Sequence, residues 1–385
     1  MRKLIVFILV LFVFSACNRP VQHSPGDTKT SDNNLKVAVF AGNGASSICV
    51  LETIEALKID SAIKAETISA AEIQKGMLGE FDVIIFPGGS GSKELNNLGQ
   101  SGIEIIREFV QEKGKGIVGI CAGSYILTST SGYPSLALSS SEHIDRDHYN
   151  RGRGLIEIKL SSKGDKIFPE IAGKRVFLQY YDGPVLAPIE TDNGPYTELA
   201  GFVTDIHPDN YAPVGITPGE TFMFNQQSGN GKLISISGHP ESTPGMRWLV
   251  PRMARWAAGS ELSGYDKKWI RPEINDSAIF FDKANKRLEN RLFWRLFDDD
   301  PQIQIQAMDK LYQLRSRPAV RWYMGMLRDK KAEIRKRAAE LLKLCEYTAA
   351  LPDLTQCYRT ETNNETKDVL SEAIVFLGGE KLMDK

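Results

Sequence analysis

The sequence lacks an excess of charge of either sign. Its 385 residues include 47 Lys and Arg against 48 Asp and Glu, which gives a formal net charge of −1. A protein that binds nucleic acid through the phosphates needs a strongly basic surface, and an acidic disordered tail needs a run of like charges. The balanced charge argues against a nucleic-acid-binding protein and against an acidic disordered tail. We therefore expect a globular protein with no nucleic-acid partner.

Cysteine is scarce, and no apolar run is long enough to cross a bilayer as a helix. Five cysteines in 385 residues are too few for a disulfide scaffold. The apolar run from Leu4 to Phe14 has 11 residues, whereas a spanning helix needs about 20. Arg2 and Lys3 precede this run, and a short basic segment before an apolar one is typical of a signal peptide. We therefore expect residues 1–16 to be a signal peptide.

Cys17 follows the small residues Ser15 and Ala16, and this junction resembles the lipobox of bacterial lipoproteins. In that family, cleavage leaves a lipid-modified cysteine as the new N-terminus. The resemblance implies lipid attachment at Cys17 and a place in the cell envelope, anchored to a bacterial membrane and facing the periplasm or the surface. Residues 17–34 are polar and without periodicity, as expected of a tether. The alternative is an ordinary secretory signal with Cys17 incidental.

From Leu35 onward, apolar strand-like segments alternate with helical ones. This order predicts an α/β domain over 35–262, built on a mostly parallel sheet with helices on both faces. Shorter strand-like runs between 154 and 227 predict an antiparallel extension of the same sheet. The expected strands of the parallel part are 36–42, 63–69, 82–89, 114–121 and 232–241, and the expected helices are 48–58, 102–113 and 244–258.

Beyond about Ala278 the pattern becomes helical and repeats itself. A set of apolar positions recurs at an interval of about 31 residues, which is typical of stacked helix pairs. The repeats resemble short HEAT repeats and predict an all-α solenoid over 280–385, after a linker over 263–279. Such a solenoid could bind a protein partner, and the alternative is an irregular helical bundle. The recurring positions are Ile303, Ala307 and Leu311, then Ile334, Ala338 and Leu342, then Thr366, Leu370 and Ile374.

Cys121 lies in the pattern G-x-C-x-G, directly after a predicted buried strand. This is the nucleophile-elbow pattern with cysteine in place of serine. Gly119 and Gly123 would relieve crowding where the strand turns sharply into a helix. A buried structural cysteine near glycines is the alternative. The spacing makes Cys121 the candidate nucleophile.

A cysteine nucleophile needs a base, and His239 is the best-placed histidine. It stands at the end of a predicted strand, in Gly-His-Pro-Glu, with Glu241 two residues later. The carboxyl ends of parallel strands share one edge of a sheet, so Cys121 and His239 can meet there. Glu241 could accept the second imidazole N–H and orient the ring. The pattern therefore predicts a catalytic triad.

Two further groups of residues bear on the site. Gly88 and Gly89 follow the strand at 82–89, where their N–H groups, with that of Ala122, could bind a developing oxyanion. This glycine-rich turn lacks the Lys-Ser/Thr ending of a P-loop, so no nucleotide cofactor is expected. His143 and His148 lie among acidic residues, but we expect a solvated loop there and no metal site.

In this order, the PGG, GxCxG and GHPE motifs resemble the class I glutamine amidotransferase superfamily, over about residues 35–260. The resemblance implies a flavodoxin-like parallel sheet and a Cys121–His239–Glu241 triad that forms a thioester with a carboxamide or γ-glutamyl carbonyl. GICAGSYIL and QYYDGPVL are similar to the domain found at the N-terminus of eukaryotic biotin-protein ligases and in bacterial proteins. That similarity implies that residues 181–183 (Tyr181, Asp182 and Gly183) lie near the pocket.

These inferences favour an envelope-tethered cysteine hydrolase or transferase that acts on an amide or γ-glutamyl bond without a cofactor. The helical segment is no synthase domain that could receive ammonia, which is against glutamine amidotransfer itself. One alternative is a non-catalytic amidotransferase-like binding module with a HEAT-repeat partner scaffold, and another places the function in the solenoid alone. The substrate, a small molecule or a peptide amide, is not identified. Cys49, Cys345 and Cys357 are expected to be packing residues.

Overall fold

The structure is a computed structural model that describes residues 34–381, and these residues belong to one compact unit. The predicted signal peptide, nearly all of the tether, and Cys17 lie outside the described residues. None of the helices within 34–381 has the length and apolar character required to cross a membrane.

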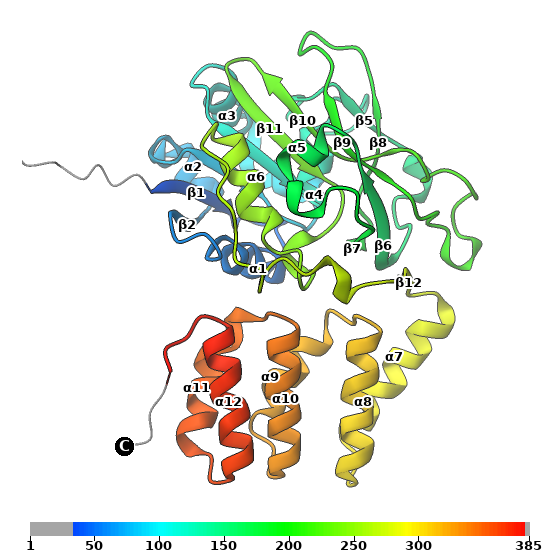
Figure 1. Cartoon of the computed structure of the whole chain (residues 1–385). Coiled ribbons are helices and arrows are strands. Elements are labelled where there is room, and N and C mark those ends of the chain that lie inside the picture. The colour runs from blue at the N-terminus through cyan, green and yellow to red at the C-terminus, as the bar shows by residue number, and fades with distance from the viewer. Residues whose placement is uncertain (1–33, 382–385) are drawn as a thin grey trace, which may run out of the picture. The chain divides into compact units, whose positions relative to one another are not determined.

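Five neighbouring strands of the 12-stranded central sheet form its parallel part (Figure 1). Its inner strands β3 and β4 are short, apolar and buried along their whole length, as expected for strands that are covered on both faces. This confirms the predicted α/β architecture with a parallel central sheet. The parallel strands lie in the order β11 (Gly231–Ile236), β4 (Gly116–Ile120), β3 (Val83–Phe86), β1 (Leu35–Phe40) and β2 (Ile63–Ile68).

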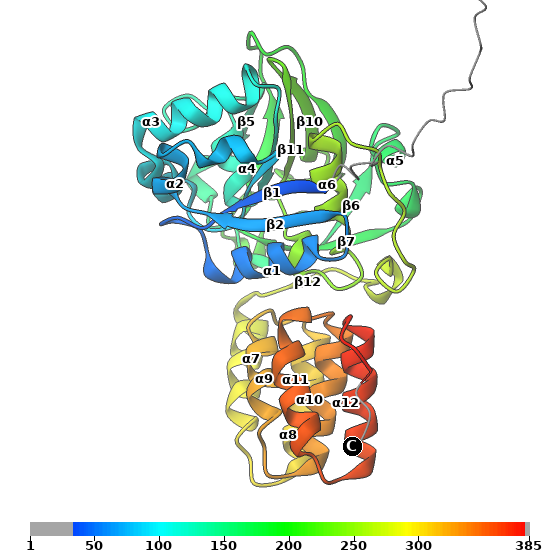
Figure 2. The ribbon, with the colours of Figure 1, turned by 90° about the vertical axis from the view of Figure 1, so that its left-hand side faces the viewer.

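Alternate residues of β1 enter two separate cores, one on each face of the sheet. Val37 and Val39 pack into the core that also contains residues of α1 (Ser47–Leu57) and α6 (Leu249–Ala257). Ala38 and Phe40 pack into the core on the other face, which Figure 2 shows with its covering helices. Burial of apolar surface on both faces stabilises this layered arrangement. The second face is covered by α2 (Ala70–Gln74), α3 (Gly91–Gln111) and α4 (Ala122–Leu127).

Two helix boundaries differ from the sequence prediction. Helix α3 begins at Gly91, well before the expected residue 102, and Gly99 inside it has a non-helical conformation with φ of 64°. Helix α6 begins at Leu249 rather than at residue 244. Gly245 has φ of +79°, in the left-handed region that an α-helix does not use, so the helix starts only after it.

The remaining strands of the sheet pair antiparallel, as predicted for the segment between residues 154 and 227. Strand β10 pairs with β11 and leads into the antiparallel part, and two shorter strands pair beside it. Helix α5 (Gly164–Ile167) also lies in this stretch. The strands are β5 (Ser141–Ile144), β6 (Arg153–Leu160), β7 (Val176–Tyr181), β8 (Val185–Pro188), β9 (Thr197–Phe202), β10 (Thr221–Ser228) and β12 (Ile279–Phe280).

The C-terminal segment is helical, as the sequence predicts. The recurring positions Ala307, Ala338, Leu311 and Leu342 are all buried in one core, which is separate from the two cores of the sheet. Side chains at the starts of α8 and α12 cap free N–H groups, which favours helix initiation at these points. The helices are α7 (Lys283–Arg295), α8 (Pro301–Gln313), α9 (Ala319–Met326), α10 (Ala332–Leu344), α11 (Leu351–Thr360) and α12 (Asn364–Phe376).

Ion pairs connect the helical segment with the α/β region. In each pair the carboxylate is almost completely buried, with a side-chain exposure of 4% or less, so that the arginine is its main source of compensating charge. The pairs are Arg153 with Glu289, Arg271 with Glu346, and Arg317 with Glu52.

Candidate active site

Cys121 occupies a sharp turn between a strand and a helix. Strand β4 ends at Ile120 and α4 begins at Ala122, and Cys121 between them has φ of 53° and ψ of −101°. Positive φ is uncommon for a residue with a side chain and costs on the order of 1–3 kcal/mol. Close packing also explains the flanking glycines, because a Cβ atom at Gly119 would lie 2.6 Å from the carbonyl oxygen of Gly123.

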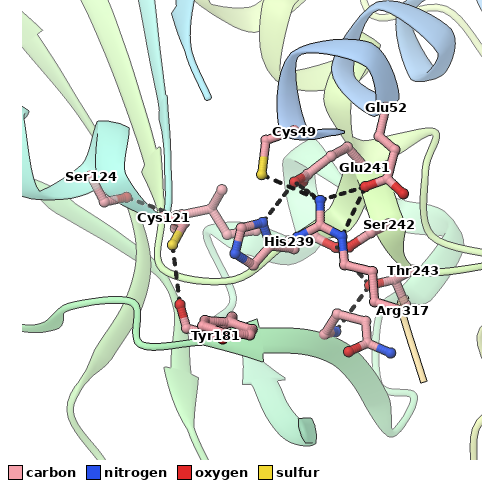
Figure 3. Close-up of polar contacts among 12 residues, drawn as sticks. Cys49, Glu52, Cys121, Ser124, Tyr181, His239, Glu241, Ser242, Thr243 and Arg317 are labelled. Carbon is pink, nitrogen blue, oxygen red and sulfur yellow. Dashed lines mark hydrogen bonds and ion pairs between the residues drawn. The ribbon is translucent and has the colours of Figure 1, made fainter. Parts of the chain in front are cut away.

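His239 and Glu241 form a buried pair just beyond the end of β11. Nδ1 of His239 lies 2.7 Å from Oε1 of Glu241, and the two residues are 3% and 0% exposed. The ring lies between the Cys121 and Glu241 side chains (Figure 3). Burial acts to lower the pKa of His239, but the charges of Cys121 and Glu241 outweigh it and hold that pKa well above its usual range. Burial likewise opposes ionisation of Glu241, whose pKa is nevertheless lowered by His239 and Arg317.

The Cys121 thiol has a second neighbour in the turn that follows β7. Its Sγ donates a hydrogen bond to the main-chain oxygen of Tyr181 at 3.3 Å. Asp182 has φ of 52°, and its carboxylate accepts a hydrogen bond from the N–H of Gly152 at 2.7 Å. Burial raises the pKa of Asp182. A Cβ atom at Gly183 would lie 1.9 Å from the main-chain oxygen of Ser237, so this turn packs closely against the chain after β11.

Gly88 and Gly89 lie at the same edge of the sheet. A Cβ atom at Gly88 would lie 2.6 Å from Cε1 of His239 and 2.8 Å from Sγ of Cys49. Gly88 therefore leaves the space that the imidazole occupies. A Cβ atom at Gly89 would lie 2.2 Å from the oxygen of Gly44. Gly89 and Ala122 both line the cavity described next, whereas Gly88 does not.

A cavity of about 1150 Å³ opens onto Cys121 and His239. Tyr181 and Asp182 line it, as the family resemblance implies, but Gly183 does not. Part of the wall comes from the helical segment, through residues between 315 and 321 and through Tyr347. The cavity is therefore bounded by both parts of the described chain.

Sequence reasoning missed Cys49, Glu52 and Arg317. Nε of Arg317 donates to Oε2 of Glu52 at 3.0 Å, and its Nη2 donates to Sγ of Cys49 at 3.3 Å and lies 3.6 Å from Oε1 of Glu241. Burial alone would raise the pKa of Cys49, but Arg317 and His239 together lower it. The expectation that Cys49 is only a packing residue was therefore incomplete. No local motif marks these residues, because Arg317 comes from the helical segment and meets α1 only in the folded chain.

Glu94 is a second buried group that the sequence did not indicate. It lies in the first turn of α3 with an exposure of 0%, and neither carboxyl oxygen has a hydrogen-bond partner among the described residues. Burial, with a smaller contribution from Cys49, raises the pKa of Glu94 to about 8. Its carboxyl group is therefore mostly uncharged at pH 7.

His143 is not in a solvated loop, as its acidic surroundings had suggested. It lies in β5, is 5% exposed and lines the cavity. Its Nδ1 is 2.8 Å from the hydroxyl of Thr130, and burial followed by the charge of Arg146 lowers the pKa of His143 to about 4. The pleat of the strand turns this ring inward although its neighbours in sequence are polar.

Three donor atoms at the site have the spacing of metal ligands. One atom each from Cys49, His239 and Glu241 lie within 4.8 Å of one another. A thiolate, an imidazole and a carboxylate are a ligand set that suits zinc. The guanidinium of Arg317 already contacts Cys49 and Glu241. The chain itself therefore places a positive charge beside these three donor atoms.

Comparison with known structures gives distant resemblances. A protein described as ThuA-like, from Parabacteroides merdae, aligns with 12% identity and a TM-score of 0.40, covering 62% of this chain and 99% of its own. A cytoplasmic protein from Salmonella typhimurium aligns with 16% identity and a TM-score of 0.37, covering 58% and 97%. A β-galactosidase from Bacillus circulans aligns with 16% identity and a TM-score of 0.36, covering 59% and 32%.

The sequence comparisons are more specific for the first part of the α/β region. No curated protein matches the chain. Residues 35–134, which include β1 to β4 and the Cys121 turn, match the family model described as the N-terminal domain of biotin-protein ligase. The chain therefore contains a biotin-protein ligase N-terminal-like domain, which occupies about a quarter of its length.

Proposed function

We propose that this protein is a cysteine hydrolase or transferase that acts on an amide or γ-glutamyl bond. The observation that carries the proposal is the buried His239–Glu241 pair, with 2.7 Å between Nδ1 and Oε1, next to a cysteine at a strained turn. A nucleophile, a base and a group that orients the base are the three parts that acyl transfer through cysteine requires. The cavity gives a substrate access to Cys121.

In the proposed reaction, the thiolate of Cys121 attacks the substrate carbonyl carbon. The oxygen takes up negative charge and is stabilised by the N–H groups of Gly89 and Ala122, which line the cavity, whereas the predicted donor Gly88 does not. His239, protonated because its pKa is raised, donates a proton to the leaving amine, the C–N bond breaks and a thioester remains. His239 then removes a proton from water, or from a second amine, which attacks the thioester. The C–S bond breaks and Cys121 leaves as the thiolate beside the protonated His239, as at the start.

A non-catalytic binding module is the second candidate. The observation that favours it is the hydrogen bond from the Cys121 thiol to the main-chain oxygen of Tyr181 at 3.3 Å, because a thiol that donates there keeps its proton. In the catalytic reading this bond belongs to a resting state, and proton transfer to His239 replaces it. The two candidates differ in whether Cys121 forms a thioester.

The test is direct capture of that thioester. The protein is incubated with glutamine, γ-glutamyl peptides and cell-wall amides, and Cys121 is examined by mass spectrometry. We expect acylation of Cys121 and release of an amine, both lost in Cys121→Ala and retained in Cys357→Ala, whose thiol lies in the helical core. If every amide is left intact and the Cys121→Ala variant keeps the phenotype of the wild type, the binding module replaces the enzyme.

We also propose that the protein is a lipoprotein of the bacterial cell envelope, with a lipid attached at Cys17. The support is the sequence of the first 17 residues, in which a basic start, an apolar run and two small residues precede the cysteine. Cells grown with labelled palmitate should yield labelled protein in the membrane fraction. The Cys17→Ala variant should carry no label; a labelled variant, or unlabelled wild type, would contradict the proposal.

Residues 280–385 are proposed to be a HEAT-like solenoid that binds a protein partner. The support is the repeat of helix pairs, since α8 and α9 correspond to α10 and α11 at the interval seen in the sequence. Substitutions of exposed side chains such as Trp294 and Phe297, on and just after α7, should weaken partner capture without changing thioester formation. Equal capture by wild type and variants would contradict this role.

A further inference from the structure

The helical segment contributes several cationic side chains to the cavity at Cys121. Arg315, Arg317 and Arg321 come from the loop between α8 and α9 and from the first turns of α9. Arg146 and Arg153 line the cavity from the α/β region. Their effect on a ligand depends on which of them are already neutralised by a carboxylate.

Two of the five arginines are neutralised within the chain. Arg317 pairs with Glu52, and it also lies 3.6 Å from Glu241. Arg153 pairs with Glu289 and lies over the ring of Phe281. Both guanidinium groups therefore have structural partners and are not available to bind a ligand anion.

The other three arginines have no carboxylate partner among the described residues. Arg146 donates to the main-chain oxygens of residues 131 and 132 at 3.0 and 3.3 Å. Arg315 donates to Oδ1 of Asn275 at 2.8 Å and to the main-chain oxygens of residues 274 and 312. Arg321 is exposed and forms neither a hydrogen bond nor an ion pair with residues 34–381. All three keep an uncompensated positive charge at the cavity wall.

The acidic residues that line the cavity offset only part of this charge, because among the described residues of its wall Asp147 alone stands unpaired against three arginines. Glu52 is used by Arg317, and Asp182 accepts a hydrogen bond from Gly152 while burial raises its pKa. Asp147 is exposed and forms no ion pair with a described residue. Charges of one sign at the wall of a cavity attract ligands of the opposite sign, because the protein around the cavity screens them less than water does.

We propose that the acyl donor of Cys121 carries an anionic group of the carboxylate class, which Arg146, Arg315 and Arg321 bind at the cavity wall. A guanidinium can donate two parallel N–H groups to one carboxylate, so arginine suits this group better than lysine does. The acyl-transfer part rests on the function proposed above, whereas the anion site itself does not. A γ-glutamyl compound, with its free α-carboxylate, belongs to this class.

The anion site can be tested without a known substrate, by using two alkylating reagents of similar size. Iodoacetate is an anion and iodoacetamide is neutral, and both react with the same thiol. The quantity measured is the rate constant for iodoacetate divided by that for iodoacetamide at Cys121, followed by mass spectrometry. This ratio should be at least about threefold higher than the same ratio for glutathione in the same buffer. This excess should shrink in about 0.5 M salt, since salt screens the arginines.

Substitutions then separate charge from structure. Arg321→Gln and Arg315→Gln should each lower the ratio about twofold, and the double variant should bring it to the glutathione value. Arg315→Lys keeps the charge but loses the guanidinium fork, so its ratio should stay near that of the wild type. Arg295→Gln is the matched control, because Arg295 is exposed on α7 and does not line the cavity. A ratio no higher than that of glutathione, or one that the double variant leaves unchanged, overturns the anion site.

A pair of amides separates failure of the site from failure of the reaction. Glutaramate carries a carboxylate, and glutaramide has the same length without charge. We expect thioester formation with glutaramate to be faster, and the difference to disappear in the double variant. If neither amide reacts while the iodoacetate preference holds, the proposed hydrolase is wrong and the anion site stands. Equal reaction of the two amides, without an iodoacetate preference, leaves the hydrolase and removes the anion site.

Discussion

Buried ionisable groups behave in opposite ways in the two regions of the molecule. Near the candidate active site, Cys49 is 3% exposed, yet Arg317 and His239 overcome the effect of burial and lower its pKa. In the helical segment, burial raises the pKa of Cys345 to about 12. Both thiols are free, so the residue type and the redox state are the same. Arg247 and Arg315 also act to lower the pKa of Cys345, but burial outweighs them. The balance between burial and nearby positive charge therefore decides the direction in which the pKa of each thiol shifts.

Two buried carboxyl groups, Glu94 near the site and Glu361 in the helical segment, also have pKa values shifted in opposite directions. Glu94, near the site, has no partner among the described residues, and burial raises its pKa to about 8. Glu361, in the helical segment, pairs with Arg335 and accepts two main-chain N–H groups, so its pKa is lowered. Glu361 is therefore held as a carboxylate by its partners, whereas Glu94, which has none among the described residues, stays mostly uncharged at pH 7.

The largest expected effect is that of Arg317→Met, which should make Cys49 behave like Cys345. Removing the guanidinium leaves Glu52 without its cation and takes a second positive charge away from Glu241, which keeps His239. Breaking a buried pair such as Arg317–Glu52 costs about 3–5 kcal/mol of unfolding free energy. The pKa of Cys49 should rise, because burial remains and the main opposing charge is gone. Urea unfolding and the pH profile of Cys49 alkylation measure the two effects.

Arg328→Met is the control for this prediction. Arg328 pairs with Asp353 at the surface, with a side-chain exposure of 72%, and exposed pairs contribute at most about 1 kcal/mol. An alkylation profile of Cys49 that is the same in Arg317→Met and in the wild type would contradict the role given to Arg317.

The next effect concerns Glu94 and the pH dependence of stability. The pKa of Glu94 is about 8 in the folded chain, against an ordinary value of 4.5. The folded protein therefore holds a proton that the unfolded chain has lost, and the unfolding free energy should fall as pH rises from about 4.5 to about 8. Glu94→Gln should remove this slope and stabilise the protein by up to about 4 kcal/mol at pH 8.

Glu361→Gln tests the opposite sign. Because the pKa of Glu361 is lowered, its carboxylate stabilises the fold above the ordinary glutamate pKa, and this contribution is lost as pH falls through the folded pKa. The variant should therefore be less stable than the wild type at pH 7. Urea unfolding at pH 5 and pH 8 measures both variants, and destabilisation by Glu94→Gln at pH 8 would refute the assignment of an uncharged Glu94.

A smaller effect is expected from Gly88→Ala, which tests how closely the site is packed. The new Cβ atom would lie 2.6 Å from Cε1 of His239, so the imidazole must shift, at a cost of about 1–3 kcal/mol. Because the shifted imidazole no longer lies where it can take the thiol proton, the alkylation rate of Cys121 near neutral pH should also fall. In Gly79→Ala the Cβ atom meets no atom within 4 Å, so this variant should keep the wild-type rate and stability. Equal behaviour of the two variants would contradict the close contact.

The smallest effect is expected in the helical segment, where there is room for a side chain. Gly325 lies inside α9, and a Cβ atom there would meet nothing within 4 Å. Alanine is favoured over glycine in a helix interior, so Gly325→Ala should raise the unfolding free energy by about 0.5–1 kcal/mol. Thermal unfolding measures this gain, and a loss of stability would show that α9 is more closely packed than its geometry indicates.

The sheet was predictable because its strands carry a local signal. The apolar segments around 36–42, 82–89 and 114–121 lie in β1, β3 and β4, since each is short, β-branched and followed by a turn. Short strands such as β5 and β8 were not predicted, because four residues are too few to carry a periodic pattern. The start of α3 was missed because Gly91 and Ser92 give no helical signal of their own.

The sequence by itself determined the cysteine turn, the histidine and its carboxylate, because each stands in a short motif at the carboxyl end of a strand. The parallel order of β3, β4 and β11 then brings these motifs to one edge. Only the tertiary structure decided the electrostatics of the site. Arg317 lies far from Cys49 and Glu241 in the sequence and acts on them through space, and a Coulomb interaction depends on distance in the fold and not on separation along the chain.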